Sequence, residues 1–247
     1  MARVSKDHID KFFDYSVDLD SRTIYLGCAA YDDDDGNGVD FFMTERLIKG
    51  LHLLETAAPN GDKPITIIAN SPGGSWYHGM AQFGAIKNCK NHVIIKMYGY
   101  AMSMGSIIPQ AADERLIDAN ASFMIHYGTD GGSHHSKIVS KWGDEGKRIC
   151  HIMENIYLDR MMEKDEEMTK EGQVDYLETT LANIVGRQQE LDFPKPTKPK
   201  YKFSKDLEKR REDVRKVLKE LLNFDSFLTA QETVAIGLAD GVIGQDD

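Results

Sequence analysis

The sequence is poor in cysteine and lacks the spacing that cysteine-based sites require. Its three cysteines, Cys28, Cys89 and Cys150, lie far apart among the 247 residues, and none belongs to a Cys-x-x-Cys pair. An odd number of isolated cysteines indicates neither a disulfide framework nor a cysteine-bound zinc ion. We expect a reducing compartment, no metal ion and no cofactor.

Long hydrophobic runs and an excess of positive charge are also lacking. No apolar stretch approaches the ~20 residues of a membrane span, and residues 1–8 carry no apolar signal-peptide core. The formal net charge of −10 is opposite to the basic footprint of a nucleic-acid-binding protein. We expect a cytoplasmic protein that binds neither membranes nor nucleic acids.

The first half of the chain alternates between two hydrophobic patterns. Short runs rich in branched residues predict strands at 23–26, 65–69, 93–98 and 122–126. Segments with helical spacing lie at about 40–57, 76–89 and 103–112. This alternation predicts an α/β fold of stacked ββα or βαβ units around a largely parallel sheet.

The second half has a different organisation. A long amphipathic pattern covers residues 136–163, and helical spacing returns at about 205–222. Between them lie a charged stretch and the proline- and lysine-rich piece 193–199, which cannot be regular helix. Thr229 and Glu232 have the spacing of a capping box before a short helix. We expect one domain over residues 1–247, with an insertion at about 164–205.

Three local features could carry chemistry. Gly73 and Gly74 follow a predicted strand, where glycines let backbone N–H groups face a ligand, although by themselves they are more typical of an ordinary turn. Ser103 lies between a strand and a helix, a setting for a nucleophile beside free N–H groups, or for close packing of small residues. His126 ends another strand, either as a catalytic base or as a buried, hydrogen-bonded residue.

Two polar segments fit metal sites poorly. The acidic run at 32–35 begins like a calcium loop, but Thr44 stands where the loop needs its bidentate glutamate, and Glu45 comes one residue late. The pair His134 and His135 has no acidic or cysteine partner at ligand spacing. We interpret both segments as solvated loops.

Four motifs in order resemble the Clp protease proteolytic-subunit family, which has a crotonase-like fold. They are Asn70-Ser71-Pro72-Gly73-Gly74, Gly99-Tyr100-Ala101-Met102-Ser103-Met104-Gly105, Met124-Ile125-His126 and Asp225-Ser226-Phe227-Leu228-Thr229-Ala230. Any one of these motifs is weak alone, but their shared order is specific. The resemblance implies a serine endopeptidase with a handle region at about 132–163.

The resemblance also implies the role of each residue. Ser103 would be the nucleophile, His126 the base and Asp225 the acid that orients the imidazole. The backbone N–H groups of Gly73 and Met104 would form the oxyanion hole. Gly74 and Met102 would contact an extended polypeptide substrate. Family members form heptameric rings that enclose a chamber, and an AAA+ ATPase unfoldase feeds them.

The chain departs from the family pattern in three places. Met102 replaces a usual alanine beside the nucleophile, and the loop 32–39 looks inserted. His126 and Asp225 are 99 positions apart, well beyond the usual family gap, and the excess lies at about 164–205. We expect this insertion to change the contact between rings or to decorate the outer surface.

Other classes of protein are also compatible with the sequence. A crotonase-like acyl-CoA enzyme would share the architecture but would use a carboxylate instead of Ser103. A Ser-Lys peptidase would need a lysine near Ser103, and Lys87, Lys90 and Lys96 have no helix-buried context that would depress a lysine pKa. A structural ring subunit or a phage-type maturation protease would keep the family fold.

Overall fold

The computed structural model describes residues 6–27, 38–56, 62–128, 138–192 and 200–245. The chain divides into two compact units. Unit 1 comprises Met1–Phe123 and Ala239–Asp247, and unit 2 comprises Met124–Leu238. The mixed α/β class predicted from the sequence is confirmed.

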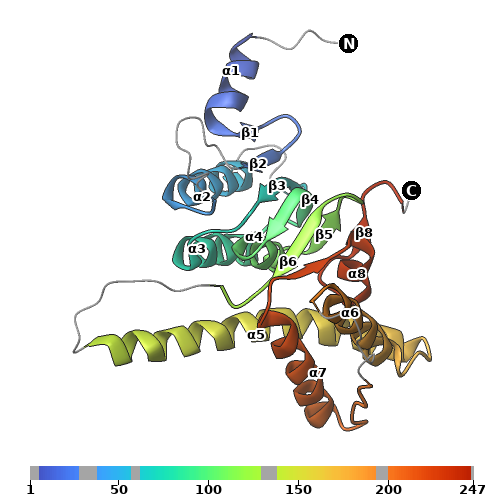
Figure 1. The fold of residues 1–247 in the computed structure, drawn as a ribbon. Helices are drawn as coiled ribbons and strands as arrows, with labels where there is room; N and C mark the ends of the chain where they lie inside the picture. The colour runs from blue at the N-terminus through green and yellow to red at the C-terminus, as the bar shows by residue number, and fades with distance from the viewer. Residues whose placement is uncertain (1–5, 28–37, 57–61, 129–137, 193–199, 246–247) are drawn as a thin grey trace. The chain divides into compact units, whose positions relative to one another are not determined.

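Unit 1 is built on a mainly parallel sheet with the strand order β1-β2-β3-β4-β5-β8 (Figure 1). Only the β1–β2 pair in this series is antiparallel. The strands are β1 (Val17–Asp18), β2 (Thr23–Gly27), β3 (Ile65–Ser71), β4 (Val93–Met102), β5 (Glu114–Ile117) and β8 (Gly241–Val242). The last strand brings the C-terminal segment back beside β5.

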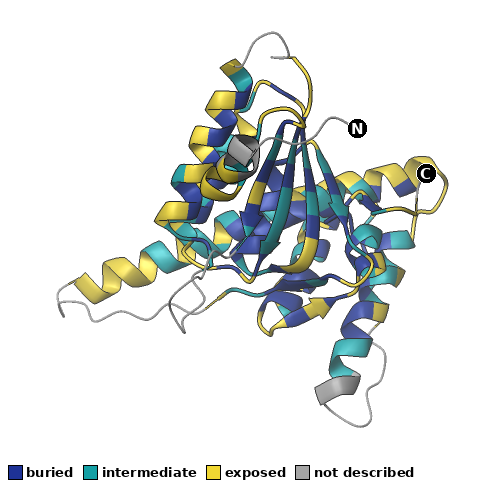
Figure 2. Cartoon of the chain, turned by 90° about the horizontal axis from the view of Figure 1, so that it is seen from above, coloured by how far each residue is buried: buried dark blue, intermediate teal, exposed yellow. Residues whose placement is uncertain are grey.

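The core of unit 1 follows the apolar runs of its two central strands. Ile65, Ile67, Val93, Ile95 and Met97 have no exposed surface, and Figure 2 shows buried residues along the strands. Burying each such side chain contributes about 1.5–3 kcal/mol to folding. The surrounding helices are α1 (Lys6–Tyr15), α2 (Phe41–Thr56), α3 (Trp76–Lys87), α4 (Met104–Ile107) and the 3₁₀ helix η1 (Ile108–Ala111).

The helix predicted at 103–112 is divided in the structure. It forms the four-residue α4 and then η1, in which Pro109 occupies one of the first two positions. Proline lacks the N–H that an α-helix interior needs, so the chain tightens into a 3₁₀ turn. Elements α1, β1 and β5 were not predicted.

Unit 2 is dominated by helices. They are α5 (Val139–Lys170), α6 (Tyr176–Asp192), α7 (Leu207–Leu222) and α8 (Ala230–Ala235), with the strand β7 (Ser226–Leu228) before the last of them. The strand β6 (Ser122–Ile125) crosses the boundary between the units and pairs with β7. The predicted capping box is confirmed, since Thr229 and Glu232 exchange both hydrogen bonds at the start of α8.

The long helix of unit 2 extends beyond the amphipathic pattern at 136–163. Helix α5 continues to Lys170 instead of ending near 163, because Asp165 and Met168 are buried and ion pairs support the last turns. Helix α6 occupies much of the segment that we expected only as an insertion. It presents Leu177, Leu181, Ile184 and Val185 to the core of unit 2.

Several predicted features lie outside the described residues. They are the acidic run 32–35, the pair His134 and His135, and the proline-rich piece 193–199. Within the described parts of the chain, no group of three or more His, Cys, Asp or Glu side chains could hold a metal ion. Across the same residues, no helix has both the length and the apolar character that a membrane crossing requires.

Candidate active site

A bulge in β4 sets the path of the chain into Ser103. Ala69 pairs with Met97, but Ser71 pairs with Ala101, so β4 carries extra residues between these two points. Gly99 sits in the bulge with a φ of +58°, and the Tyr100 N–H donates to the Asn70 Oδ1 atom at 3.0 Å. A bulge of this kind bends a strand and redirects the side chains that follow it.

Ser103 has an uncommon backbone conformation for a residue with a side chain. Its φ is +53° and its ψ is −124°, at the junction of β4 and α4. The Ser103 carbonyl accepts hydrogen bonds from the Ser106 N–H at 2.9 Å and from the Ser106 hydroxyl at 2.7 Å. Such strained residues cost of order 1–3 kcal/mol and cluster at functional sites. The side chain of Ser103 is only partly buried.

Gly73 lies directly against the serine. A Cβ atom at Gly73 would be 2.6 Å from the Ser103 Cβ and 3.1 Å from the Met104 nitrogen, and its φ is +106°. Both the space and the conformation therefore require glycine. The Gly73 N–H donates to the Ser71 hydroxyl at 3.2 Å, a long hydrogen bond that a stronger acceptor could replace.

Three residues next to Gly73 and Ser103 differ in what they can offer a substrate: Gly74, Met104 and Met102. Gly74, with a φ of +141°, forms a parallel bridge with Val39, whose N–H donates to the Gly73 carbonyl at 2.6 Å. The side chain of Met104 is buried and packs against Gly79 of α3, so this residue can offer only its backbone. Met102 is half-buried.

His126 and Asp225 form a hydrogen-bonded pair in unit 2. The His126 Nδ1 atom lies 2.8 Å from the Asp225 Oδ1 atom. An ionised carboxylate can only accept, so the Nδ1–H group of the imidazole is the donor. This assigns the neutral ring to the tautomer in which Nε2 has the lone pair. A base needs that lone pair on the side away from the carboxylate.

Two backbone contacts fix the segments that carry this pair. The Tyr127 N–H donates to the Leu222 carbonyl at 2.9 Å, joining the residue after His126 to the end of α7. The Ser226 hydroxyl is buried and donates to the Leu221 carbonyl at 2.7 Å. The positions of the histidine and the aspartate thus depend on the last turn of α7.

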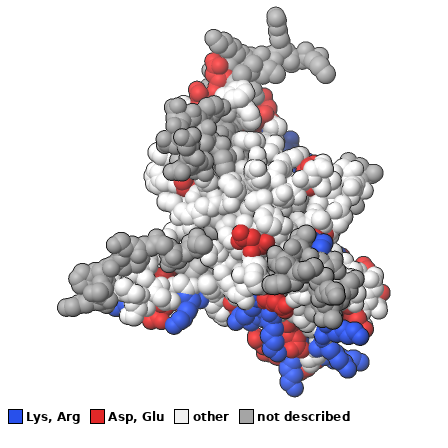
Figure 3. Space-filling model, viewed as in Figure 1, with Lys and Arg blue, Asp and Glu red and all other residues white. Residues whose placement is uncertain are grey.

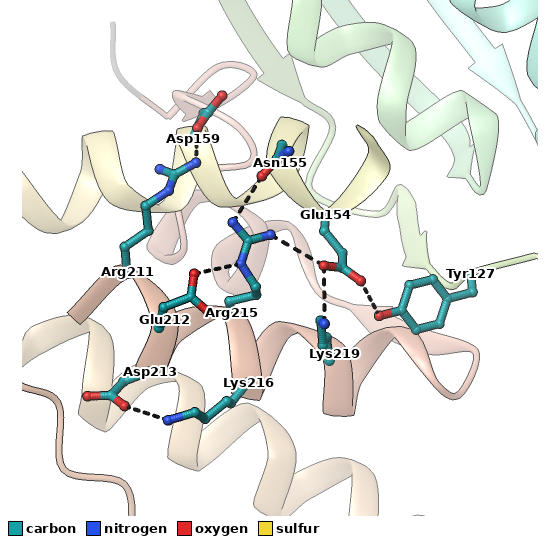
Figure 4. A network of polar contacts seen from close by, with 10 residues as sticks. All are labelled: Tyr127, Glu154, Asn155, Asp159, Arg211, Glu212, Asp213, Arg215, Lys216 and Lys219. Carbon is teal, nitrogen blue, oxygen red and sulfur yellow. Dashed lines mark hydrogen bonds and ion pairs between the residues drawn. The ribbon is translucent and has the colours of Figure 1, made fainter. Parts of the chain in front are cut away.

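A buried glutamate that we did not predict lies behind the pair. Glu154 of α5 accepts from the Tyr127 hydroxyl at 2.8 Å and faces Arg215 and Lys219 of α7 (Figure 4). Burial and the hydrogen bond to Glu154 raise the pKa of the Tyr127 phenol, so it stays a donor. Figure 3 shows Lys and Arg side chains interspersed with Asp and Glu side chains at the lower end of the view, where α7 lies. The sequence did contain a signal for Glu154: it is a carboxylate three residues before Tyr157, on the apolar face of α5.

The predicted residues thus fall into two groups. Gly73, Ser103 and Met104 come together in unit 1, and His126 and Asp225 come together in unit 2. Each group has the local geometry that its suggested role needs. Joining both groups into one catalytic centre is a proposal.

Comparison with known proteins gives the family. The Clp protease family model matches residues 34–182. An ATP-dependent Clp protease proteolytic subunit of Deinococcus radiodurans is 27% identical over 164 residues, covering 66% of this chain and 75% of the relative. The ATP-dependent Clp protease proteolytic subunit 3, chloroplastic, of Arabidopsis thaliana is 37% identical over 101 residues, 39% of this chain and 32% of the relative. The resemblance seen in the sequence is confirmed, and the chain belongs to the Clp protease family of serine peptidases.

Proposed function

We propose that the protein is a serine endopeptidase in which Ser103, His126 and Asp225 form one catalytic triad. The observation that carries the proposal is the 2.8 Å hydrogen bond between His126 and Asp225, which presents the Nε2 lone pair of the ring. The strained junction at Ser103, held against Gly73, supplies the matching nucleophile. Family membership supports the combination.

The reaction follows from these groups. The Ser103 hydroxyl attacks the scissile carbonyl while its proton passes to His126 Nε2. The carbonyl oxygen becomes an oxyanion, stabilised by the N–H groups of Gly73 and Met104. The imidazolium, stabilised by Asp225, then gives its proton to the leaving amine as the C–N bond breaks. Water repeats the sequence on the acyl-enzyme and releases the acid and free Ser103.

The substrate is an extended polypeptide held by its main chain. The family resemblance supports pairing of the substrate main chain with Gly74 and with the segment at 122–126, a form of strand addition. Half-buried Met102 beside the nucleophile favours apolar residues before the cleaved bond. Such recognition is tolerant of sequence and suits unfolded chains.

We further propose that the protein is cytoplasmic and works as a homo-oligomeric ring that encloses the active sites and receives polypeptides from an AAA+ ATPase. These proposals rest on the family, and heptameric rings are the expected form. The long gap between His126 and Asp225 supports an insertion at about 164–205 beside the handle region, so double rings should contact one another differently or should carry surplus mass. Negative-stain images with ordinary double heptamers and no extra density would contradict this.

Fluorophosphonate labelling tests the function itself. These reagents capture a serine only when a base activates it, so mass spectrometry should find the adduct on Ser103. The variant His126→Ala should lose the adduct, whereas Ser140→Ala, at an exposed serine of α5, should keep it. No adduct on Ser103 in the assembled protein would favour an acyl-CoA enzyme or a structural ring subunit.

A further inference from the structure

The position of the Asp225 side chain depends on how firmly its backbone is held. It is 65% exposed and lies immediately before β7, a strand of three residues. An exposed side chain on a short strand gains little from packing, so its placement depends on what holds β7. Strand β6 pairs with one side of β7.

Helix α6 provides a second hold on this strand. The Phe227 carbonyl accepts from the Arg187 Nη2 atom at 2.8 Å and from the Gln188 Nε2 atom at 2.5 Å. Phe227 is two residues beyond Asp225. Both donors come from α6, which lies within the insertion expected at about 164–205.

Arg187 also holds the far end of β7. Its Nε and Nη2 atoms contact the two carboxylate oxygens of Glu232 at 2.8 and 2.7 Å. The same carboxylate accepts from the Thr229 N–H at 2.9 Å, closing the capping box of α8. One planar guanidinium thus joins residue 227 directly and residue 229 through Glu232, a geometry that the point charge of a lysine could not reproduce.

Helix α6, which carries Arg187 and Gln188, is packed in the core of unit 2. Leu181, Ile184 and Val185 of α6 are buried, and Arg187 follows them on the next residues of the same helix. The Arg187 and Glu232 side chains are 36% and 21% exposed, so water screens the pair only partly. The Arg187 guanidinium therefore connects a helix packed in the core of unit 2 to the strand that begins beside Asp225.

We infer that Arg187 is a positioning residue, which acts through β7 to keep the Asp225 carboxylate on the Nδ1 atom of His126. The inference rests on the proposed function, because it assigns Arg187 a role in that same catalytic centre. Displacing a catalytic group by about 1 Å can cost on the order of 100-fold in rate. Arg187→Gln should therefore lower kcat for a peptide substrate by about 10- to 100-fold and leave KM within about twofold.

A double-mutant cycle separates positioning from mere stability. If Arg187 acts through Asp225, then Arg187→Gln should cost little further activity in an Asp225→Asn background. The control is Arg148→Gln, which removes an exposed ion pair with Glu145 on α5 and should leave kcat unchanged in both backgrounds. Gln188→Ala removes a single hydrogen bond to Phe227 and should give a smaller, equally background-dependent loss, even if Arg187→Gln folds poorly.

The outcomes are distinguishable. A loss in kcat that disappears in the Asp225→Asn background supports the inference. An equal loss in both backgrounds, or a lower thermal midpoint with unchanged kcat, overturns it and leaves the proposed triad standing. If Asp225→Asn itself keeps full activity, the proposed triad fails and the inference fails with it.

Discussion

Gly73 lies so close to Ser103 that a Cβ atom on the glycine would come within 2.6 Å of the Cβ atom of the serine. This contact joins the loop after β3 to the junction after β4. It is made possible by the glycine and by the bulge around Gly99. The loop that offers a backbone donor and the residue that offers a hydroxyl are thus held together within unit 1.

Replacing this glycine should damage catalysis more than stability. Gly73→Ala places a methyl group against Ser103, at a residue whose φ is +106°. The loop must therefore move, and the N–H group of residue 73 no longer points at the oxyanion. We expect kcat to fall by about 100- to 1000-fold, the cost of losing one oxyanion donor.

A matched control exists in the same unit. Gly84 of α3 has open space where a Cβ would lie, so Gly84→Ala should keep activity and add about 0.5–1 kcal/mol of stability. Peptide cleavage and urea unfolding of both variants check the pair. Equal activity in Gly73→Ala and Gly84→Ala would remove Gly73 from the mechanism.

The charge of Asp225 should matter for the chemical step. Asp225→Asn keeps the shape of the side chain, but an amide can donate to Nδ1 and so favours the wrong tautomer of His126. We expect kcat to fall on the order of 10³- to 10⁴-fold, with KM nearly constant. Steady-state kinetics on a fluorogenic peptide measure this, and a change confined to KM would argue against the orienting role.

A buried ion pair between α5 and α7 should contribute strongly to the stability of unit 2. Arg210 of α7 contacts both oxygens of Asp165 at 2.5 and 2.7 Å, and both side chains are about 5% exposed. Asp165→Asn leaves the guanidinium buried without its counter-charge, so unfolding should become easier by about 3–5 kcal/mol.

The exposed pair of Glu166 and Lys170, on the same helix, is the control for that experiment. Glu166→Gln should leave the urea midpoint in place, because solvent screens the pair. Chemical denaturation followed by circular dichroism compares the two variants. Similar midpoints would mean that the Arg210–Asp165 pair contributes no more than a surface contact.

The reactivity of Cys89 should depend on pH in a shifted range. Burial raises the pKa of the Cys89 thiol from 9.0 to about 11. Because only the thiolate attacks iodoacetamide, the alkylation rate at pH 8 should be about 100-fold below that of an ordinary thiol, and should keep rising towards pH 11. Peptide mapping of the adduct, with N-acetylcysteine as reference, measures the midpoint. A midpoint at or below 9 would contradict this environment.

The sequence predicted those parts of the molecule that depend on local pattern. The runs at 65–69 and 93–98 became β3 and β4 because alternate residues there are buried, and the Thr229–Glu232 spacing became a capping box. Gly73 and Ser103 were also found locally, as small residues at the ends of strands. Gly73 follows β3 and Ser103 follows β4. The two residues lie close together because these strands are neighbours in the sheet.

The parts that were missed depend on contacts between distant residues. The bulge before Ser103 needs the hydrogen bond between Asn70 and Tyr100, and the extension of α5 needs Arg210 to pair with Asp165. Helix α6 did carry a signal, because Leu177, Leu181 and Ile184 have helical spacing. The proline-rich piece that follows obscures this pattern, because it marks the surrounding segment as irregular.

The central claim is that Ser103 and His126 act as one unit, and a comparison of single and double variants tests it most directly. Ser103→Ala and His126→Ala should each abolish cleavage of a fluorogenic peptide, and the double variant should be no slower than either, because each residue is useless without the other. Native mass should be the same for all four proteins. Cleavage by Ser103→Ala at the wild-type rate would contradict the account.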